Sequence, residues 1–288
     1  MGGIKSELID FELTRDTCFI CGKLATTVEH VIPKWLQRKF NLWDYKLIIP
    51  NQTDITYRQL VVPACKKCNN EVYGRLEVKI RNNTANDKEI WRWANKIHFG
   101  LQLKDRFLDF DRSKPGIKIS EVFNYSDALQ QSRHFLHCVN NDFTCQPDPF
   151  GSVFKFQFEE EQSFNLIHLN HSNSLFICIG KVAFIVFITD GQILRQDDVG
   201  ICKKYEQLYA RKHSMADALF FFAQMVYYME QYTYSNPIAF HSKSIVKLGR
   251  ATLRAEKPVD KDLFRRICDR FGITWIDEEE LRKKISGL

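Results

Sequence analysis

The chain has 288 residues, of which 44% are hydrophobic, 26% charged and 13% aromatic. These values exclude a disordered chain and allow one large domain or two to three small ones. The formal charge is +6, and the segment from Pro33 to Arg81 alone has ten Lys and Arg against four Asp and Glu. This local excess favours an anionic partner, most commonly nucleic acid, although a solvated basic face is also compatible with it.

Two CxxC pairs are the first motifs along the chain. Cys18 and Cys21 flank Phe-Ile, and Cys65 and Cys68 flank Lys-Lys, in a chain of nine cysteines. The N-terminus has no basic-then-apolar signal pattern, so we expect a reduced, cytoplasmic protein whose CxxC pairs bind metal. Two such pairs supply the four thiolates of a closed and therefore structural zinc site, to which a redox CxxC is the weaker alternative.

The segment between the two pairs contains an acid next to a histidine. Glu29 and His30 belong to the stretch EHVIPKWL, in which we expect Pro33 in the first turn of a short helix. The stretches YKLIIP (45–50) and YRQLVVP (57–63) predict strands. Helices are expected in NNEVYGRLEVKIR (69–81) and in DKEIWRWANKIHFGLQLK (87–104), where apolar residues recur at helical spacing.

Oxygen-bearing side chains follow the second cysteine pair directly. Asn69 and Asn70 begin the next helix, and a spacing of seven residues places Asn70 and Glu77 on one face that can look back toward Glu29 and His30. Carboxylate and amide oxygens suit a hard cation such as Mg²⁺, and the imidazole is then free to take a proton from water. Structural roles are also open, because Asn69 could cap the helix and Glu77 could form an ion pair.

Taken together, these motifs resemble the HNH nuclease family. The order CxxC, EHVIP, strand, CxxCNN, continued by EVYGRLE and WRWANKI, is similar to a subgroup with a four-cysteine zinc ribbon, over roughly residues 15–105. The resemblance implies a ββα-metal fold in which Glu29 and Asn69, with Asn70 as a further ligand, hold Mg²⁺ or Mn²⁺. It implies that His30 is the general base.

The middle Asn of the family pattern has no direct counterpart. The position five residues before the second CxxC is Leu60, with Gln59 beside it, and Asn51 is the nearest Asn upstream. Gln59 or Asn51 would then orient the catalytic histidine or polarise the phosphate, or this role is unfilled.

The implied reaction is hydrolysis of a phosphodiester bond. His30 would deprotonate a water in line with the phosphate, the cation would stabilise charge on the phosphoryl and leaving oxygens, and the products would carry 5′-phosphate and 3′-hydroxyl ends. Lys34, Arg38, Lys66 and Lys67 would neutralise backbone phosphates, so that binding depends strongly on salt and little on sequence.

The remainder of the chain predicts an α+β region with no recognisable motif. We expect a domain boundary near residue 108, because Pro-Gly follows in DFDRSKPGIK, which gives a nuclease domain at 1–108 and a second region at 109–288. Alternation predicts antiparallel strands at about 119–200, and the run SLFICIGKVAFIVFIT (174–189) predicts two strands joined at Gly180-Lys181 rather than a membrane span. Helices are expected at about 203–288, including MADALFFFAQMVYYMEQY as a buried helix and DKDLFRRICDRFG with Gly272 as its C-cap.

Three functions follow from this reading. The first is a metal-dependent DNA endonuclease, in a setting such as prokaryotic antiviral defence, with a C-terminal region that docks substrate, forms a homo-oligomer or binds a regulatory partner. The second is a zinc-stapled nucleic-acid-binding protein with a degenerate nuclease site. The third is an RNase toxin of the same fold. No membrane association is expected.

Overall fold

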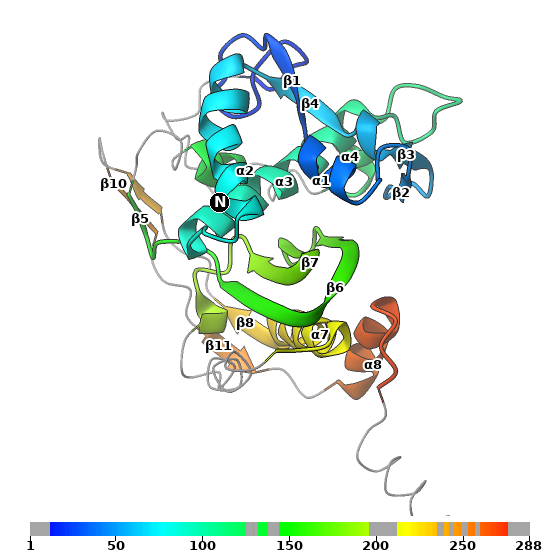
Figure 1. Cartoon of the computed structure of the whole chain (residues 1–288), viewed down its shortest axis with the longest axis vertical. Helices are drawn as coiled ribbons and strands as arrows, with labels where there is room; N and C mark the ends of the chain where they lie inside the picture. The colour runs from blue at the N-terminus through cyan, green and yellow to red at the C-terminus, as the bar shows by residue number, and fades with distance from the viewer. Residues whose placement is uncertain are drawn as a thin grey trace, which may run out of the picture.

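The computed structural model describes residues 12–124, 129, 132–137, 144–195, 212–234, 239–241, 245–248, 253–256 and 260–275. It is a mixed α+β structure with small sheets, and four cysteines cluster near its N-terminus (Figure 1). The coarse fold class expected from the sequence is thereby confirmed.

Two pairs of antiparallel strands and five helical segments build the N-terminal part. Strand β1 (Thr27–His30) pairs with β4 (Val61–Ala64), and β2 (Lys46–Ile48) pairs with β3 (Asp54–Thr56). The helical segments are α1 (Lys34–Lys39), the single-turn η1 (Tyr57–Gln59), η2 (Lys67–Tyr73), α2 (Gly74–Arg81) and α3 (Asp87–Phe107).

The long helix α3 confirms the predicted helical pattern and fixes the position of the other elements. Asn86 begins it with a capping box, since its side chain accepts from the backbone N–H of Glu89, whose own side chain returns to the N–H of Asn86. Trp91 and Trp93 are fully buried. This helix is therefore covered on most of its circumference and runs through the middle of the molecule (Figure 1).

One predicted strand is only half correct. The stretch YRQLVVP begins with the 3₁₀ turn η1, and strand pairing starts at Val61. The turn is favoured because Gln59 folds back on Thr56, with its Oε1 accepting from the backbone N–H and the hydroxyl of that residue.

A two-stranded sheet of β6 (Val153–Leu169) and β7 (Ser174–Phe187) forms the central layer. The prediction of two strands joined at Gly180-Lys181 is wrong, because β7 runs unbroken through both residues. Gly180 instead has a φ of 63° where the register against β6 shifts near Gln162. The chain reverses farther away, where Asn173 donates its N–H to the carbonyl of Asn170.

Strand β7 is buried on both faces, which explains its near-continuous apolar sequence. Leu175, Ile177 and Val186 belong to the core shared with α3, whereas Phe176 and Phe187 belong to a second core with α7 (Met215–Gln231) and α8 (Lys261–Arg270). The layers are therefore α3, sheet and α7, with α8 beside α7 (Figure 1).

The C-terminal expectations are corrected in two places. Residues 119–122 (α4, Ile119–Val122) and 132–137 are helical where strands were expected. Short strands occur where only helices were expected, namely β8 (Tyr232–Tyr234), β9 (Ala239–His241), β10 (Ile245–Leu248) and β11 (Leu253–Glu256). In these places pairing with distant strands decides the structure, since β10 pairs with β5 (Thr144–Gln146) as well as with β9.

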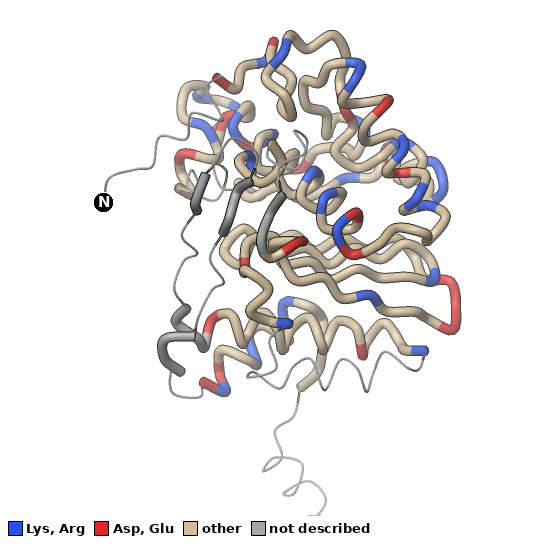
Figure 2. The backbone as a smooth tube through the Cα atoms, turned by 90° about the vertical axis from the view of Figure 1, so that its left-hand side faces the viewer, with Lys and Arg blue, Asp and Glu red and all other residues tan. Residues whose placement is uncertain are grey.

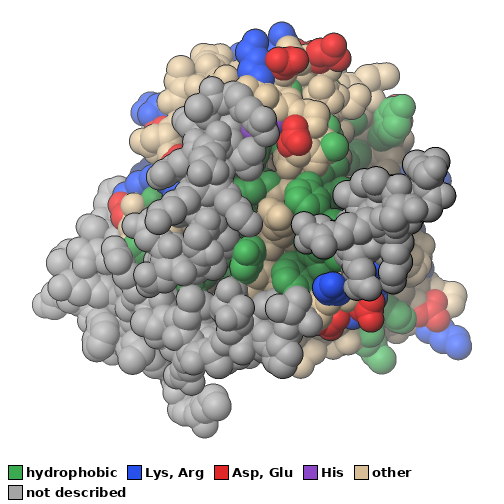
Figure 3. Space-filling view, turned by 90° about the horizontal axis from the view of Figure 1, so that it is seen from below, with side chains coloured by type: hydrophobic (Ala, Val, Ile, Leu, Met, Phe, Trp, Pro, Cys, Tyr) green, Lys and Arg blue, Asp and Glu red, His purple; other side chains and the backbone are tan. Residues whose placement is uncertain are grey.

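The predicted helices α7 and α8 are confirmed, and Gly272 follows the end of α8 with a φ of 69°, as a C-cap glycine requires. Figure 3 views the molecule from below and shows hydrophobic side chains in patches between charged ones. Within the described residues, no helix is long and apolar enough to cross a membrane.

Candidate metal centre and adjoining polar site

Four cysteines lie close together at one end of the paired strands β1 and β4. The sulfur atoms of Cys18, Cys21, Cys65 and Cys68 all lie within 4.8 Å of one another. Cys18 and Cys68 are buried, and Cys21 and Cys65 are partly exposed. Such a set of ligands could hold a metal ion such as zinc.

Local backbone geometry explains how each pair turns. Gly22, with a φ of 73°, donates its N–H to the carbonyl of Cys18, which closes a tight turn after the first pair. In the second pair the N–H of Cys68 points at the sulfur of Cys65, at 3.5 Å. A hydrogen bond between the side chains of Cys18 and Cys68 lowers the pKa of Cys18 and raises the pKa of Cys68.

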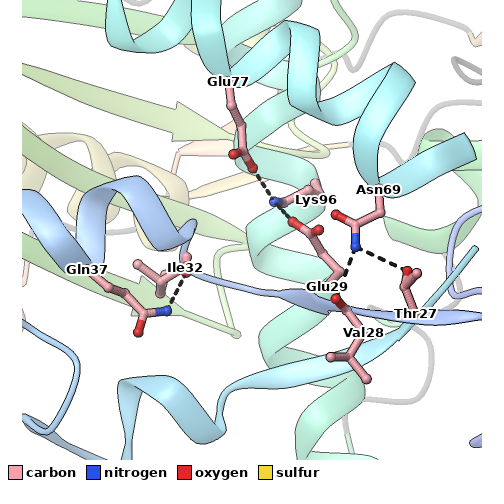
Figure 4. A network of polar contacts seen from close by, with 8 residues as sticks. All are labelled: Thr27, Val28, Glu29, Ile32, Gln37, Asn69, Glu77 and Lys96. Atoms are coloured by element: carbon pink, nitrogen blue, oxygen red, sulfur yellow. Dashed lines mark hydrogen bonds and ion pairs between the residues drawn. The ribbon is translucent and has the colours of Figure 1, made fainter. Parts of the chain in front are cut away.

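A buried charge network lies on the helix-facing side of β1. The ammonium group of Lys96, from α3, forms ion pairs with the carboxylates of Glu29 and Glu77, the latter at 2.9 Å (Figure 4). The Lys96 side chain is completely buried, whereas the side chains of Glu29 and Glu77 keep 8% and 17% exposure. The ammonium group is thus sealed from solvent, and of the two carboxylates Glu77 keeps the larger exposure.

The charges of this network depend on one another. Burial alone would lower the pKa of Lys96, but the nearby charges of Glu29 and Glu77 outweigh it and raise that pKa. Burial raises the pKa of Glu29 against the opposing effect of Lys96. Two carboxylates against one ammonium group leave one formal negative charge, and the network therefore still attracts a cation.

Asn69, rather than Asn70, faces the strand. Its amide donates to the hydroxyl of Thr27, at 3.2 Å, and to the carbonyl of Val28, at 3.0 Å (Figure 4). Asn70 is exposed. The expectation that Asn70 and Glu77 share one face assumes α-helical spacing, but residues 67–73 form the π-helix η2, whose wider turn changes that spacing.

His30 and Glu29 point to opposite faces of β1, as neighbours in a strand must. The Glu29 side is covered by helices, whereas the His30 side is open, since Val28 on the same face is 55% exposed. The ring of His30 stacks on Trp43 with 5.7 Å between centroids. Burial, together with the charges of Lys34 and Lys96, lowers the pKa of His30 to about 4, so the imidazole is neutral at pH 7.

The two residues considered for the middle position both have structural contacts. Gln59 uses its Oε1 on Thr56, and the residue lines an adjacent cleft. Asn51 donates to the carbonyl of Phe110 at 2.8 Å and thereby ties the β2–β3 turn to the loop after α3. The assignment of Gln59 as a catalytic residue stays a prediction.

The four cations predicted to bind nucleic acid are exposed. Lys34 and Arg38 lie on α1, and Lys66 and Lys67 lie at the start of η2. Figure 2 shows Lys and Arg positions interspersed with Asp and Glu along the chain. Their role at a nucleic acid stays a prediction.

Lys96 is the polar residue that sequence reasoning missed. It lies in α3 between Trp93 and Ile97, and this helix is apolar on most sides. A lysine in such a helix is rarely buried unless it has acidic partners. That rule could have directed attention to Glu29 and Glu77.

No family model, curated protein or solved structure matches this chain. The likeness to the HNH family therefore depends on the motif residues alone.

Proposed function

We propose that residues 12–107 form a zinc-stapled ββα-metal module that hydrolyses phosphodiester bonds in nucleic acid, with DNA as the expected substrate. Zinc at the four cysteines would hold the paired strands β1 and β4 against η2. One cysteine pair precedes β1 in the sequence and the other follows β4. A closed set of four thiolates makes this ion structural.

His30 is the observation that carries the proposal. It combines a neutral imidazole, an open strand face and a cation, Lys34, close enough to lower its pKa. A neutral imidazole can accept a proton from water, and a cation beside it can hold the phosphate that the water attacks. Trp43 would keep the ring oriented by stacking.

The donor chemistry near β1 fits a hard divalent cation. Glu29, Glu77 and Asn69 offer only oxygen ligands, and the ion pair with Lys96 uses one oxygen of Glu29, Oε1. When bound, Mg²⁺ or Mn²⁺ would neutralise charge that develops on the phosphate. Lys96 would hold the two carboxylates in place from behind.

The test is a nuclease assay with matched variants. Supercoiled plasmid and a single-stranded RNA should be offered with Mg²⁺, and we expect plasmid nicking that falls at least about 100-fold in His30→Ala, the scale of a lost general base. His171→Ala, another partly exposed histidine, should retain full activity. Zinc content must be equal in all three proteins, and cleavage that survives in His30→Ala would refute the assigned role.

A second function, binding without hydrolysis, is favoured by one specific observation. Lys96 already places a positive charge between Glu29 and Glu77, and Glu29 faces away from His30. On this alternative the protein retains DNA in a salt-dependent manner but shows no Mg²⁺-dependent cleavage. The same plasmid experiment, with a binding measurement added, separates the two functions.

A further inference from the structure

A cleft of about 510 Å³ lies between the β3–η1–β4 segment and the C-terminal end of α3. Its charged and polar lining consists of Asp54, Arg58, Gln59, Lys104 and Arg112. Its apolar lining consists of Ile55, Val61 and Leu108. This volume falls in the range of small-molecule sites.

The cleft reaches the position on β4 that lies opposite His30. Val61 lines the cleft and is the direct partner of His30 in the strand register. Directly opposed residues of an antiparallel pair project from the same face. Trp43 adds a second link, since its ring stacks on His30 and its carbonyl accepts from the N–H of Arg58.

The charges of the cleft are unbalanced in favour of an anion. Its single carboxylate, Asp54, is already paired with Lys46 at 2.6 Å. Arg58 has an exposed pair with Asp44, which contributes little and exchanges readily. Lys104 is partly buried and, within the described residues, has no ion-pair partner; burial and the charge of Arg15 lower its pKa.

The walls of the cleft are fixed before any ligand binds. Arg112 donates to the carbonyl of Asp54 at 2.9 Å, and Asn51 holds the carbonyl of Phe110. Both bonds join the loop after α3 to the β2–β3 hairpin. Gln59 is held through its oxygen, which leaves its amide N–H groups free to donate into the cleft.

We propose that this cleft binds a phosphate ester, with Lys104, Arg58 and Gln59 on the phosphate and Ile55, Val61 and Leu108 against its sugar or base. Two positive side chains and an amide donor match the oxygens of a phosphate group, and Arg favours such contacts by its geometry. The ligand is a free nucleotide or one nucleotide of a nucleic-acid strand. Occupancy of the cleft does not require hydrolysis at His30.

The experiment measures binding by titration calorimetry to the full-length, zinc-loaded chain. The probes are inorganic phosphate, deoxyadenosine monophosphate and an eight-nucleotide DNA, all without Mg²⁺, in the His30→Ala background so that cleavage is irrelevant. We expect Lys104→Met to raise the dissociation constant about tenfold or more. Lys114→Met removes the same charge from the exposed loop after α3 and should change it less than twofold.

The outcomes separate the possible sources of the phosphate. Tighter binding of the mononucleotide than of the oligonucleotide assigns the cleft to a free nucleotide, and the reverse order assigns it to a nucleic-acid backbone. Absence of binding by all three probes overturns the proposal, as does equal weakening by Lys104→Met and Lys114→Met. Arg58→Gln serves as an independent second variant should Lys104→Met fail to fold. Nuclease activity without binding in the cleft would disprove this inference alone.

Discussion

The two faces of the paired strands β1 and β4 differ in how their charged groups are compensated. We call the face of Glu29 the inner face and the face of His30 the outer face. On the inner face, Glu29 is enclosed and its charge is met by Lys96 from α3. On the outer face, His30 is neutral at pH 7, and the exposed Lys34 close to it has no ion-pair partner within the described residues. Buried charges must be matched inside the protein, whereas unmatched charges near the surface are available to a ligand. We therefore propose that the inner face contributes stability in addition to its oxygen ligands for a cation, and that the outer face contacts the nucleic acid.

Loss of the metal at the four cysteines should have the largest effect, because both faces depend on it. We expect Cys65→Ser to lower the thermal midpoint of the N-terminal part by more than 10 °C, since binding energy of a structural zinc is folding energy. Cys178→Ser, at a buried cysteine of the central sheet, is the control that should leave the zinc content unchanged. One equivalent of zinc in the Cys65→Ser protein, together with an unchanged midpoint, would contradict the structural assignment.

Removal of Lys96 should lower the free energy of unfolding, because it leaves the carboxylates of the inner face without a counter-charge. Lys96→Met leaves two carboxylates enclosed without a counter-charge, which typically costs about 3–5 kcal/mol. Denaturant unfolding should show this loss, and Lys79→Met, which removes an exposed pair with Glu89, should cost no more than about 1 kcal/mol.

A compensating variant makes the Lys96 prediction sharper. Glu29→Gln and Glu77→Gln added to Lys96→Met remove the unpaired charges and should restore part of the lost stability. Failure of this restoration would mean that packing of the lysine stem, rather than charge, explains the effect.

The sequence was sufficient for the local features of both faces. Ligand spacing identified the four cysteines, and helical periodicity identified α3 and α7. It was not sufficient where distant contacts decide the structure. Lys96 is 67 residues from Glu29, so no spacing rule could pair them. The π-turn in η2, which exchanges Asn70 for Asn69, also has no simple sequence signal.

The same limit explains the error at Gly180. A Gly-Lys step between apolar runs has the appearance of a hairpin turn, but β6 is 17 residues long and pairs with β7 on both sides of the glycine. Tertiary pairing therefore overrides the local turn preference. Likewise, the pairing of His30 with Val61, which links His30 to the cleft, could be recognised only once the register of β1 and β4 was known.

A third prediction concerns the contact between His98 of α3 and the partly buried His168 of β6. The Nδ1 of His98 lies 2.9 Å from the Nε2 of His168, and burial lowers the pKa of His168 to about 4. Since this folded-state value is below the unfolded value of about 6.5, stability should be fully present above pH 6.5 and fall as the pH decreases toward 4.

The expected loss for this pair is about 1–2 kcal/mol between pH 6.5 and 4.5. Urea unfolding across this range should show a shallower pH dependence in His168→Gln than in the unmodified protein. His171→Gln is the comparison: burial also lowers the pKa of His171, but its side chain is exposed and paired with Glu230, so this variant should change the pH dependence less than His168→Gln. An identical pH dependence in all three proteins would show that the pair is not responsible.

The smallest expected effect is on the stability of Asn69 and Asn70 variants. It tests which of the two asparagines is bonded to β1. Asn69→Ala removes two hydrogen bonds to β1, from an amide that is only partly exposed, and should lower the free energy of unfolding by about 1 kcal/mol. Asn70→Ala removes the same group from an exposed position and should change it by no more than about 0.5 kcal/mol. Equal effects would mean that η2 does not have the π-helical register that turns Asn69 toward Thr27 and Val28. Because Asn69 holds the Val28 carbonyl, in the peptide that directly precedes Glu29, its loss should also reduce any Mg²⁺-dependent cleavage more than the loss of Asn70.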